Sequence, residues 1–399
     1  MSSGPNCILT LNGGSSSIRF AVYEFAVEPR CVLSGQLDRI GQPRPRLSVR
    51  DPATGPQAHQ PMAAPDQATA ISGLLDWLTA QPTLADVQAV GHRVVHGGPA
   101  HQQPERITPV LLADLQQLIP FDPTHLPGAL ALIEAVHARY PHLPQVACFD
   151  TAFHQHMPRV AQLLPLPRRF DARGIRRYGF HGLSYAYLLQ ELARLAGPAA
   201  AQGRVVLAHL GNGASLAAVR GGQCQDTTMG FTPVGGLVMG TRPGDLDPGV
   251  VSYLLESEGL SASQFSQLVN HECGLLGVSE TSSDMQELLA RQATDGRAAE
   301  AVDLFCYQVR KGVGAYAAVL GGLDTLVFAG GIGEHAAEVR ARICQGLAFL
   351  GVEVDEARNA AHAGVISPAG RRVTVRVIPT DEERLIARTV SQLLTAEPA

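Results

Sequence analysis

Lysine is almost absent from this sequence, because Lys311 is the only lysine among 31 basic residues. A phosphate-binding loop of the GxxxxGK[ST] type needs lysine directly after glycine, whereas Lys311 follows Arg310. Lys311 is also the one lysine that could form a Schiff base with a substrate. We therefore expect arginine to supply the positive charge in any active site.

Cysteine pairs and long apolar runs are also missing. No CxxC pair is present among the seven cysteines to hold zinc or to exchange disulfides, so we expect reduced, buried thiols. The longest weakly polar run, residues 312–323, has about half the length of a membrane span. No leader pattern is visible at the N-terminus, so a cytoplasmic location without membrane contact is expected.

The charge and composition favour a globular protein that binds small molecules. Net charge is only −5 and no basic stripe is present, so nucleic-acid binding is not expected. Apolar residues make up 45% and charged residues 17%, which is typical of a folded chain. A length of 399 residues corresponds to two or three domains of about 150 residues.

Short apolar runs alternate with helical segments along the chain, which predicts an α/β layered fold. Strands are expected at 87–95, 145–150, 204–210, 325–330 and 373–378. Helices are expected at 127–140, at 185–196 with Ser184 as N-cap, and from Asp247–Pro248 onward. Residues 39–66 are expected to be irregular apart from a short strand at 47–49.

A repeated strand, glycine-rich turn and strand is the most informative feature of the organisation. Residues 6–25 and 204–222 both fit this pattern, and Asn12-Gly13-Gly14-Ser15 matches Asn212-Gly213-Ala214-Ser215 200 positions later. The repeat suggests two related lobes, although so short a match also fits two unrelated turns. Backbone N–H groups of such turns, with serine or asparagine donors beside them, can bind phosphate.

A third glycine-rich turn follows the strand expected at 325–330. Gly330, Gly331 and Gly333 precede a helix expected to run through Arg340, which places backbone donors beside a helix N-terminus. Three such turns favour nucleotide binding over ordinary turns. Gly331, Gly333 and Ala336, with Asp355 about 20 residues further on, also fit a dinucleotide-binding fingerprint, so a dehydrogenase is an alternative. Little chain remains after residue 331 for its sheet.

Four polar side chains stand where catalytic groups of α/β proteins are usually found. Arg93, Asp150 and His181 lie at the ends of apolar runs, and MGTRPGDLDPG surrounds Arg242 with glycines and acids. Each also has a structural interpretation: Asp150 and Asp247 could cap helices, His181 could be a core histidine, and Arg93 could form an ion pair.

Eight segments in order resemble the acetate kinase family of the sugar-kinase, heat-shock and actin ATPase superfamily. These segments are LNGGSSSIRF, GHRVVHGG, CFDTAFH, RYGFHGLS, AHLGNGAS, MGTRPGDLDPG, AGGIGE and PTDEE. The resemblance implies an α/β fold of two actin-like (ribonuclease H-like) lobes with a nucleotide cleft between them. The first lobe would be residues 1–150, completed by a C-terminal helix in 382–399, and the second, nucleotide-binding lobe would be 151–381.

The resemblance also implies the reaction, the cofactor and the assembly. The family transfers a phosphoryl group reversibly and in line from Mg-ATP to acetate, giving acetyl phosphate and ADP, in acetyl-CoA biosynthesis. The expected partners are ATP and acetate or another short-chain carboxylate, with Mg²⁺ or Mn²⁺ as cofactor, in a homodimer. A carboxylate is already ionised at pH 7, so it needs no general base, only relief from anion repulsion.

Site residues are carried over from the family position by position. The catalytic residues would be Arg93, Asp150, His181 and Arg242, and the carboxylic acid would bind to Arg93, Val95, Phe180 and Pro233. The metal ligands would be Asn12 and Glu382. The nucleotide would contact Arg19, His209, Leu210, Gly211, Asn212, Gly213, Asp284, Met285, Gln286, Gly331, Ile332, Gly333, Glu334 and His335. Asp150 would orient an arginine or metal-bound water.

Three positions depart from the family pattern. Arg19 and Gln286 replace a usual lysine and arginine near the nucleotide, and His125 stands in altered surroundings. Two alternatives therefore stay open: a propionate or butyrate kinase, because one methylene changes binding by only about 1–3 kcal/mol, and a catalytically weak nucleotide-binding regulator. Retention of the four catalytic residues argues against the regulator.

Overall fold

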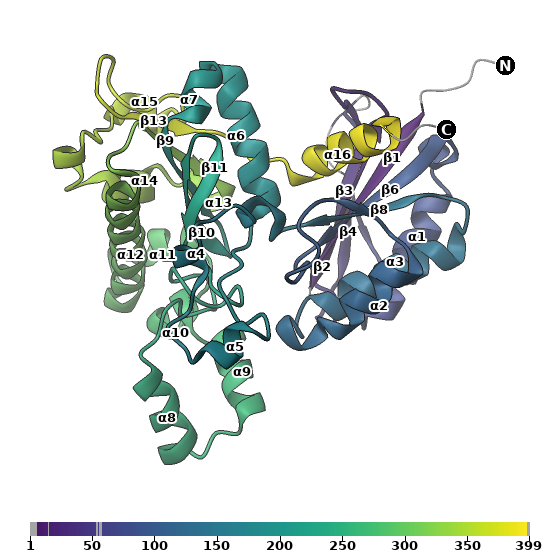
Figure 1. Cartoon of the computed structure of the whole chain (residues 1–399), viewed down its shortest axis with the longest axis horizontal. Helices are drawn as coiled ribbons and strands as arrows, with labels where there is room; N and C mark the ends of the chain where they lie inside the picture. The colour runs from purple at the N-terminus through teal and green to yellow at the C-terminus, as the bar shows by residue number, and fades with distance from the viewer. Residues whose placement is uncertain (1–5, 15, 53–54, 56–57, 397–399) are drawn as a thin grey trace. The chain divides into compact units, whose positions relative to one another are not determined.

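One β-sheet lies at the centre of each of two units into which the computed structural model divides (Figure 1). Unit 1 consists of residues 1–152 and 381–399, and unit 2 of residues 153–380. The structure describes residues 6–14, 16–52, 55 and 58–396. The chain thus leaves unit 1 once and returns to it at its end.

The described part of unit 1 contains a mixed eight-stranded sheet in the order β5-β4-β3-β2-β1-β6-β8-β7. Its strands are β1 (Cys7–Gly13), β2 (Ser17–Glu24), β3 (Cys31–Asp38), β4 (Arg46–Arg50), β5 (Ala58–Pro61), β6 (Val87–Val94), β7 (Glu105–Arg106) and β8 (Gln145–Phe149). β1 is antiparallel to β2 and parallel to β6, which is parallel to β8. The carboxyl ends of β1, β6 and β8 therefore lie along one edge.

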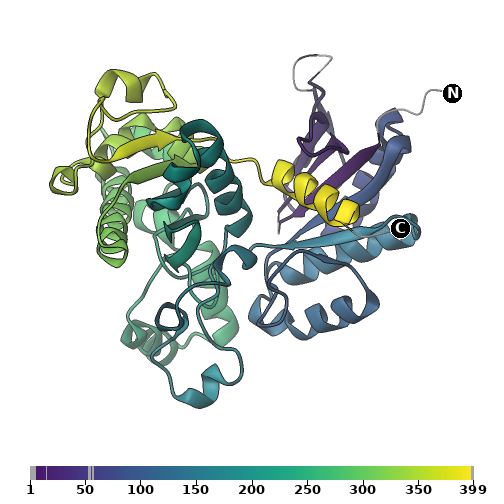
Figure 2. The ribbon, with the colours of Figure 1, turned by 45° about the horizontal axis from the view of Figure 1, so that its top comes forward.

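Helices cover both faces of this sheet (Figures 1 and 2). They are α1 (Gln67–Thr79), α2 (Pro109–Gln117), α3 (Leu126–Arg139) and α16 (Glu382–Ala396). Leu9 of β1 packs in one buried cluster with Leu74 of α1 and Leu132 of α3. On the other face, a Cβ at Gly91 would lie 2.4 Å from Cγ2 of Ile386, so glycine lets α16 approach the sheet closely.

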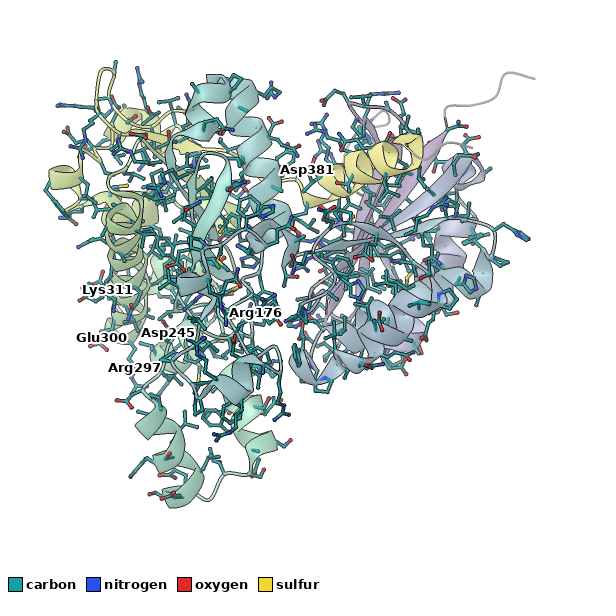
Figure 3. All side chains as sticks on the ribbon, in the orientation of Figure 1. Arg176, Asp245, Arg297, Glu300, Lys311 and Asp381 are labelled. Atoms are coloured by element: carbon teal, nitrogen blue, oxygen red, sulfur yellow. The ribbon has the colours of Figure 1, made fainter. Side chains whose placement is uncertain are left out.

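Helix α16 begins next to a capping aspartate. Asp381, labelled in Figure 3, accepts a hydrogen bond from the backbone N–H of Arg384 at 2.9 Å and another from the Tyr23 hydroxyl at 3.1 Å. Tyr23 belongs to β2, so the start of the helix is tied to the sheet. This tie places Glu382, the first residue of α16, near the end of β1.

The described part of unit 2 contains a five-stranded sheet in the order β11-β10-β9-β12-β13. Its strands are β9 (Arg204–Leu210), β10 (Ala214–Arg220), β11 (Gln223–Thr227), β12 (Thr325–Ala329) and β13 (Thr374–Val377). β9 is antiparallel to β10 and parallel to β12. The turn after β9 and the turn after β12 therefore emerge at the same edge of the sheet.

The unit 2 sheet is also covered on both faces. Its helices are α4 (Arg159–Gln162), α5 (Arg168–Asp171), α6 (Gly182–Ala196), α7 (Pro198–Gln202), α8 (Pro248–Ser257), α9 (Ala262–His271), α10 (Gly274–Ser279), α11 (Met285–Arg291), α12 (Gly296–Leu320), α13 (Gly330–His335), α14 (Ala337–Cys344) and α15 (Glu356–Ala360). Leu188 of α6 packs against Leu207 on one face, and Gly312 of α12 approaches Leu216 on the other. The single lysine, Lys311, is exposed on α12 (Figure 3).

Most of the elements expected from the sequence are confirmed. Both hairpins form, as β1–β2 and β9–β10, the five expected strands are present, and the short strand at 47–49 is β4. The expected helices at 127–140 and from Pro248 correspond to α3 and α8. The capping role of Asp247 is confirmed, because its side chain accepts a hydrogen bond from the Gly249 N–H at 2.7 Å.

Two local expectations were wrong. β5 forms within the stretch expected to be irregular, because β4 offers it an open edge to pair with. Ser184 does not cap α6, which begins at Gly182 after His181. The buried Ser184 hydroxyl instead bonds the His209 side chain, which is distant in sequence.

The expectation of buried thiols is confirmed for most of the cysteines. All seven cysteines are free, five of them buried, with Cys31 and Cys273 partly exposed. Within the described residues, no helix combines the length and apolar character needed to cross a membrane.

Three buried histidines are expected to make the fold sensitive to acid. Burial lowers the pKa of His92, His96 and His154 from 6.5 to about 4. Between these two values the unfolded chain binds more protons than the folded one, so we expect the free energy of unfolding to fall as the pH drops from 6.5 towards 4. The slope should reach up to about 1.4 kcal/mol per pH unit for each imidazole.

Urea denaturation at several pH values between 7 and 5 measures this slope. The variant His142→Gln, which changes an exposed histidine, is the matched control and should keep it. A free energy of unfolding that does not change over this range would contradict the prediction.

Candidate active site

Four polar side chains of unit 1 meet at the edge where its parallel strands end. Asn12 lies near the end of β1, Arg93 near the end of β6, Asp150 directly after β8, and Glu382 at the start of α16. They are far apart in sequence but adjacent in the fold, because parallel strands bring their carboxyl ends together.

Arg93 links these side chains. Its Nε and Nη2 donate to Oδ2 of Asp150 at 3.1 and 2.5 Å, and its Nη1 donates to Oδ1 of Asn12 at 3.0 Å. Nε also lies 3.9 Å from Oε2 of Glu382. Asp150 is fully buried, and its Oδ1 has no hydrogen-bond partner in the described structure. A buried acceptor without a partner is costly, so this atom is a candidate for binding a ligand.

Negative charge is concentrated around Glu382. Burial raises the pKa of its carboxyl to about 7, Arg93 opposes this shift, and the neighbouring Asp150 and Glu383 add to it. The Nδ2 of Asn12 donates to both Glu382 and Glu383 at 3.3 Å. The cluster would gain stability from additional positive charge.

This cluster suits a hard divalent cation. Mg²⁺ prefers one or two carboxylates plus water and phosphate oxygens over an all-protein cage. The described residues contain no group of three or more His, Cys, Asp or Glu side chains placed to hold a metal. The unpartnered Oδ1 of Asp150, the amide oxygen of Asn12 and the carboxylate of Glu382 nevertheless supply the oxygen donors that Mg²⁺ prefers.

The other expected residues of unit 1 lie nearby. Arg19 is paired with Asn12 in the β1–β2 register, is exposed, and donates from Nε to Gln36 at 3.2 Å. Val95 directly follows β6 and is buried. Asn12 therefore has a cation beside it on the neighbouring strand.

His181 is held in an unusual conformation in unit 2. Its φ of 57° lies in the left-handed region, which is uncommon for a residue with a side chain. His154 bonds the preceding Phe180 carbonyl from Nε2 at 3.0 Å. The His181 ring stacks on that of His209 with centroids 4.2 Å apart, and His209 Nδ1 lies 2.8 Å from the Ser184 hydroxyl.

Glycine at position 213 leaves space for two side chains. A Cβ at Gly213 would lie 2.8 Å from Nη2 of Arg242 and 3.1 Å from Nε2 of His181. Arg242 is anchored by Nη1, which donates to the Pro233 carbonyl at 2.7 Å. A guanidinium nitrogen and an imidazole nitrogen thus converge on one backbone position at the tip of the β9–β10 hairpin.

The loop that carries Arg242 is fixed at both ends. Oδ1 of Asp245 accepts a hydrogen bond from the Gly236 N–H at 2.8 Å, which closes the loop. The Gly240 N–H donates to the Asn212 carbonyl at 3.0 Å, and a Cβ at Gly240 would lie 2.0 Å from the Asn212 amide oxygen. Asp245 and Gly240 therefore have structural roles in presenting Arg242.

The glycine-rich turn 330–335 forms α13 beside the same hairpin tip. A Cβ at Gly330 would lie 2.7 Å from the Leu210 carbonyl oxygen, and the backbone nitrogen of Gly331 lies 3.9 Å from where a Cβ of Gly211 would stand. Glu334 closes the turn, since its Oε1 accepts from the Gly330 N–H at 2.9 Å and the Thr380 N–H at 3.2 Å. Two of the three predicted phosphate-binding turns are therefore adjacent within unit 2.

The remaining expected residues of unit 2 occupy different environments. Asp284 caps α11 by accepting from the Gln286 N–H at 2.7 Å, Met285 is buried, and Gln286 is exposed. Phe180 and Pro233 are buried. The dehydrogenase alternative uses Asp355 as the acid that binds the ribose. In the structure this side chain instead caps α15, where it accepts a hydrogen bond from the Arg358 N–H at 3.0 Å.

Sequence reasoning missed several supporting residues. Arg340 is fully buried and donates to the carbonyls of Gly333 and Glu334 at 2.9 and 2.8 Å. Tyr185, Ser184 and Thr380 support the two stacked histidines. Of these residues, only Arg340 could have been noticed in the sequence, because it is a charged residue on an otherwise apolar helix face.

The chain is similar to known proteins over nearly its whole length. The model of the Acetokinase family matches residues 7–388. The chain is 46% identical over 394 residues to an acetate kinase of Rhodopseudomonas palustris, covering 97% of this chain and 98% of that one. It is 42% identical over 395 residues to a propionate kinase of Citrobacter rodentium, covering 98% and 97%.

A solved structure shares the fold. The crystal structure of Porphyromonas gingivalis acetate kinase covers 98% of this chain and 100% of its own, with a TM-score of 0.88 and 38% identity. The fold is thus the α/β fold of two actin-like lobes. With a family model over nearly its whole length and relatives well above 30% identity, the chain belongs to the acetokinase family.

Proposed function

We propose that this protein transfers a phosphoryl group reversibly between Mg-ATP and acetate, giving acetyl phosphate and ADP. The convergence of Arg242 Nη2 and His181 Nε2 over Gly213 is the observation that carries the proposal. Two donors aimed at one point beside phosphate-binding turns suit the charge that develops on a transferring phosphoryl group. Family membership supports the same reaction.

The chemistry needs charge compensation more than proton transfer. Acetate is ionised at pH 7 and attacks phosphorus directly, so the obstacle is repulsion between two anions. Arg93 would hold the carboxylate, while Arg242 and His181 would stabilise the equatorial phosphoryl oxygens. Guanidinium groups suit this task because they bind planar oxyanions with two parallel hydrogen bonds.

Asp150, Asn12 and Glu382 would support a divalent cation. Mg²⁺, or Mn²⁺ in its place, supplies partial neutralisation of the triphosphate when bound. Asp150 fixes the guanidinium of Arg93 through Oδ2 and keeps Oδ1 available, so it acts as an orienting group and not as a base. Asn12 and Glu382 would be ligands to the ion.

The nucleotide would bind to unit 2. The tip His209–Gly213 and the turn Gly331–His335 offer adjacent backbone N–H groups for phosphates, and the start of α11 at Asp284–Gln286 would contact the nucleoside. Arg19 of unit 1 would add positive charge.

The acyl group would bind against Val95, Phe180 and Pro233. All three side chains are buried, which suits a short apolar methyl group. A propionate kinase is the second candidate, because such a protein is 42% identical to this chain over nearly its full length. One methylene changes binding by only about 1–3 kcal/mol, so few side chains need to differ.

Initial rates of phosphoryl transfer decide between these substrates. The acyl phosphate formed from Mg-ATP with acetate, propionate or butyrate is trapped as the hydroxamate. We expect the highest kcat/KM with acetate, no product without a divalent cation, and almost none with Arg242→Ala. Arg204→Ala is the matched control, since Arg204 pairs with Asp324 at the opposite end of β9. Preference for propionate would establish the second candidate, and no product with any acid would favour a nucleotide-binding regulator.

We also propose a homodimer formed in part by α8. This helix has no buried residue, and it exposes Val250 to 43% and Tyr253 to 61%. An apolar helix of which no residue is buried in the described structure suits a self-complementary interface. Light scattering should give the mass of two chains, and Tyr253→Glu should shift the mass towards one chain. A wild-type protein with the mass of one chain would rule out the dimer.

The domain boundaries and the location are further proposals. Unit 1 and unit 2 would be the two lobes, with boundaries at 152/153 and 380/381 close to the expected 150/151 and 381/382. Free cysteines throughout the chain suit a reducing cytoplasm. Cell fractionation tests the location.

A further inference from the structure

The repeated turn motif contains a serine whose hydroxyl is not available to phosphate. Ser215 is fully buried, and its Oγ lies 2.8 Å from Nδ1 of His181 and 2.5 Å from the hydroxyl of Tyr185. Tyr185 is also fully buried. A continuous chain of hydrogen bonds therefore runs from the core of unit 2 to the imidazole of His181.

The direction of these hydrogen bonds follows from the tyrosine. Burial raises the pKa of Tyr185 well above its usual value, so the phenol keeps its proton. In the described structure, Ser215 Oγ is the hydrogen-bond partner of this fully buried hydroxyl, so the phenol donates its proton to Ser215. Ser215, which accepts this proton, has its own proton left to donate to Nδ1 of His181.

We propose that Tyr185 and Ser215 are positioning residues that hold His181 as the neutral tautomer with its proton on Nε2. Nε2 is the nitrogen beside Arg242 at Gly213. The kinetic part of this inference rests on the proposed phosphoryl transfer, whereas the tautomer does not.

The tautomer decides whether His181 attracts or repels a phosphoryl oxygen. With the proton on Nε2, the imidazole donates a hydrogen bond to the oxygen. With the proton on Nδ1, a lone pair of Nε2 would face the same oxygen, and the buried Ser215 hydroxyl would lose its acceptor. The ring cannot easily turn to exchange its nitrogens, because it stacks on His209 and its backbone is fixed at Phe180.

Long-range ¹H–¹⁵N correlation spectra of the histidine side chains test the tautomer directly. In the full-length wild-type protein, the His181 signals, assigned by their loss in His181→Gln, should show an unprotonated Nδ1 and a protonated Nε2. In Ser215→Ala the two nitrogens should move towards a mixture of tautomers. A wild-type His181 protonated at Nδ1, or at both nitrogens, would overturn the proposal.

Kinetics with the same variants test the consequence. We expect kcat to fall about 10- to 100-fold in Ser215→Ala, with the KM for ATP changed less than about threefold, since one catalytic donor loses its alignment. Tyr185→Phe keeps the packing and should give a smaller loss of kcat with the same change in the spectrum. Ser367→Ala is the matched control, because it removes another buried hydroxyl of unit 2, one bonded to the Val375 N–H at 3.1 Å.

The outcomes separate this inference from the proposed reaction. If wild-type protein forms no acyl phosphate, the proposed function fails, and the spectra still decide the tautomer. If Ser215→Ala and Tyr185→Phe fold and keep the wild-type kcat and spectrum, Ser215 and Tyr185 do not position His181. A kcat loss in Ser367→Ala as large as in Ser215→Ala would also overturn the inference, because it would reflect general loosening of the sheet.

Discussion

The variant Asp150→Asn is expected to lose about 10³-fold or more in kcat while it still binds ATP, because the amide keeps the shape but loses the charge. Oδ2 of Asp150 accepts two hydrogen bonds from Arg93, and Oδ1 is buried without a partner. Asparagine would weaken the hold on Arg93 and would place a neutral amide where a full negative charge is proposed to act.

Hydroxamate formation measures the turnover of this variant, and isothermal titration calorimetry measures its ATP affinity. The matched control is Asp324→Asn, since Asp324 also accepts from both Nε and Nη2 of its arginine, Arg204. That pair is partly exposed in unit 2, so the control should keep its turnover. Turnover of Asp150→Asn within tenfold of wild type would refute the proposed role.

The variant Arg340→Met is expected to lower the free energy of unfolding by about 3–5 kcal/mol. The guanidinium is fully buried and donates to the carbonyls of Gly333, Glu334 and Asn359 and to the Asn359 side chain at 2.8–2.9 Å. Among the described residues Arg340 forms no ion pair, so these backbone and amide oxygens compensate its positive charge. Methionine fills similar space but leaves those oxygens buried without donors.

Urea denaturation measures the loss of stability, and the KM for ATP reports on the turn. Because Arg340 bonds the end of α13, we also expect that KM to rise. Arg310→Met is the matched control: Arg310 donates to the carbonyls of Ile343 and Arg342 from a partly exposed position, so water can replace it. An equal effect of both variants on the denaturation midpoint would contradict the importance of burial at Arg340.

Tertiary structure changed the interpretation of the repeated turn motif. From the match between the two turns, Ser215 was predicted to belong to a phosphate-binding turn. In the fold it is buried against Tyr185 and His181. Local sequence could not show this, because Tyr185 lies on α6 and Ser215 on β10. Such contacts depend on how a helix packs on a sheet.

Helix boundaries show the same difference between what local sequence predicts and what tertiary contacts decide. The start of α8 was predictable, because Asp247 and Pro248 satisfy the first turn through local contacts. The start of α6 was not, because His181 adopts a left-handed conformation supported by contacts from His154 and Ser215. Local propensity favoured Ser184 as the N-cap of α6, but its hydroxyl forms a hydrogen bond with the His209 side chain instead.

The sequence by itself determined the α/β class, the two hairpins and the scarcity of lysine, since these depend on periodicity, local turns and composition, and its resemblance to the acetate kinase family supplied most of the candidate residues. The tertiary structure decided which of those residues meet: Arg93 with Asp150, and His181 with Arg242 at Gly213. It also decided their states, such as the raised pKa of Glu382. Burial and long-range contacts set both, and neither is encoded in any short segment of the chain.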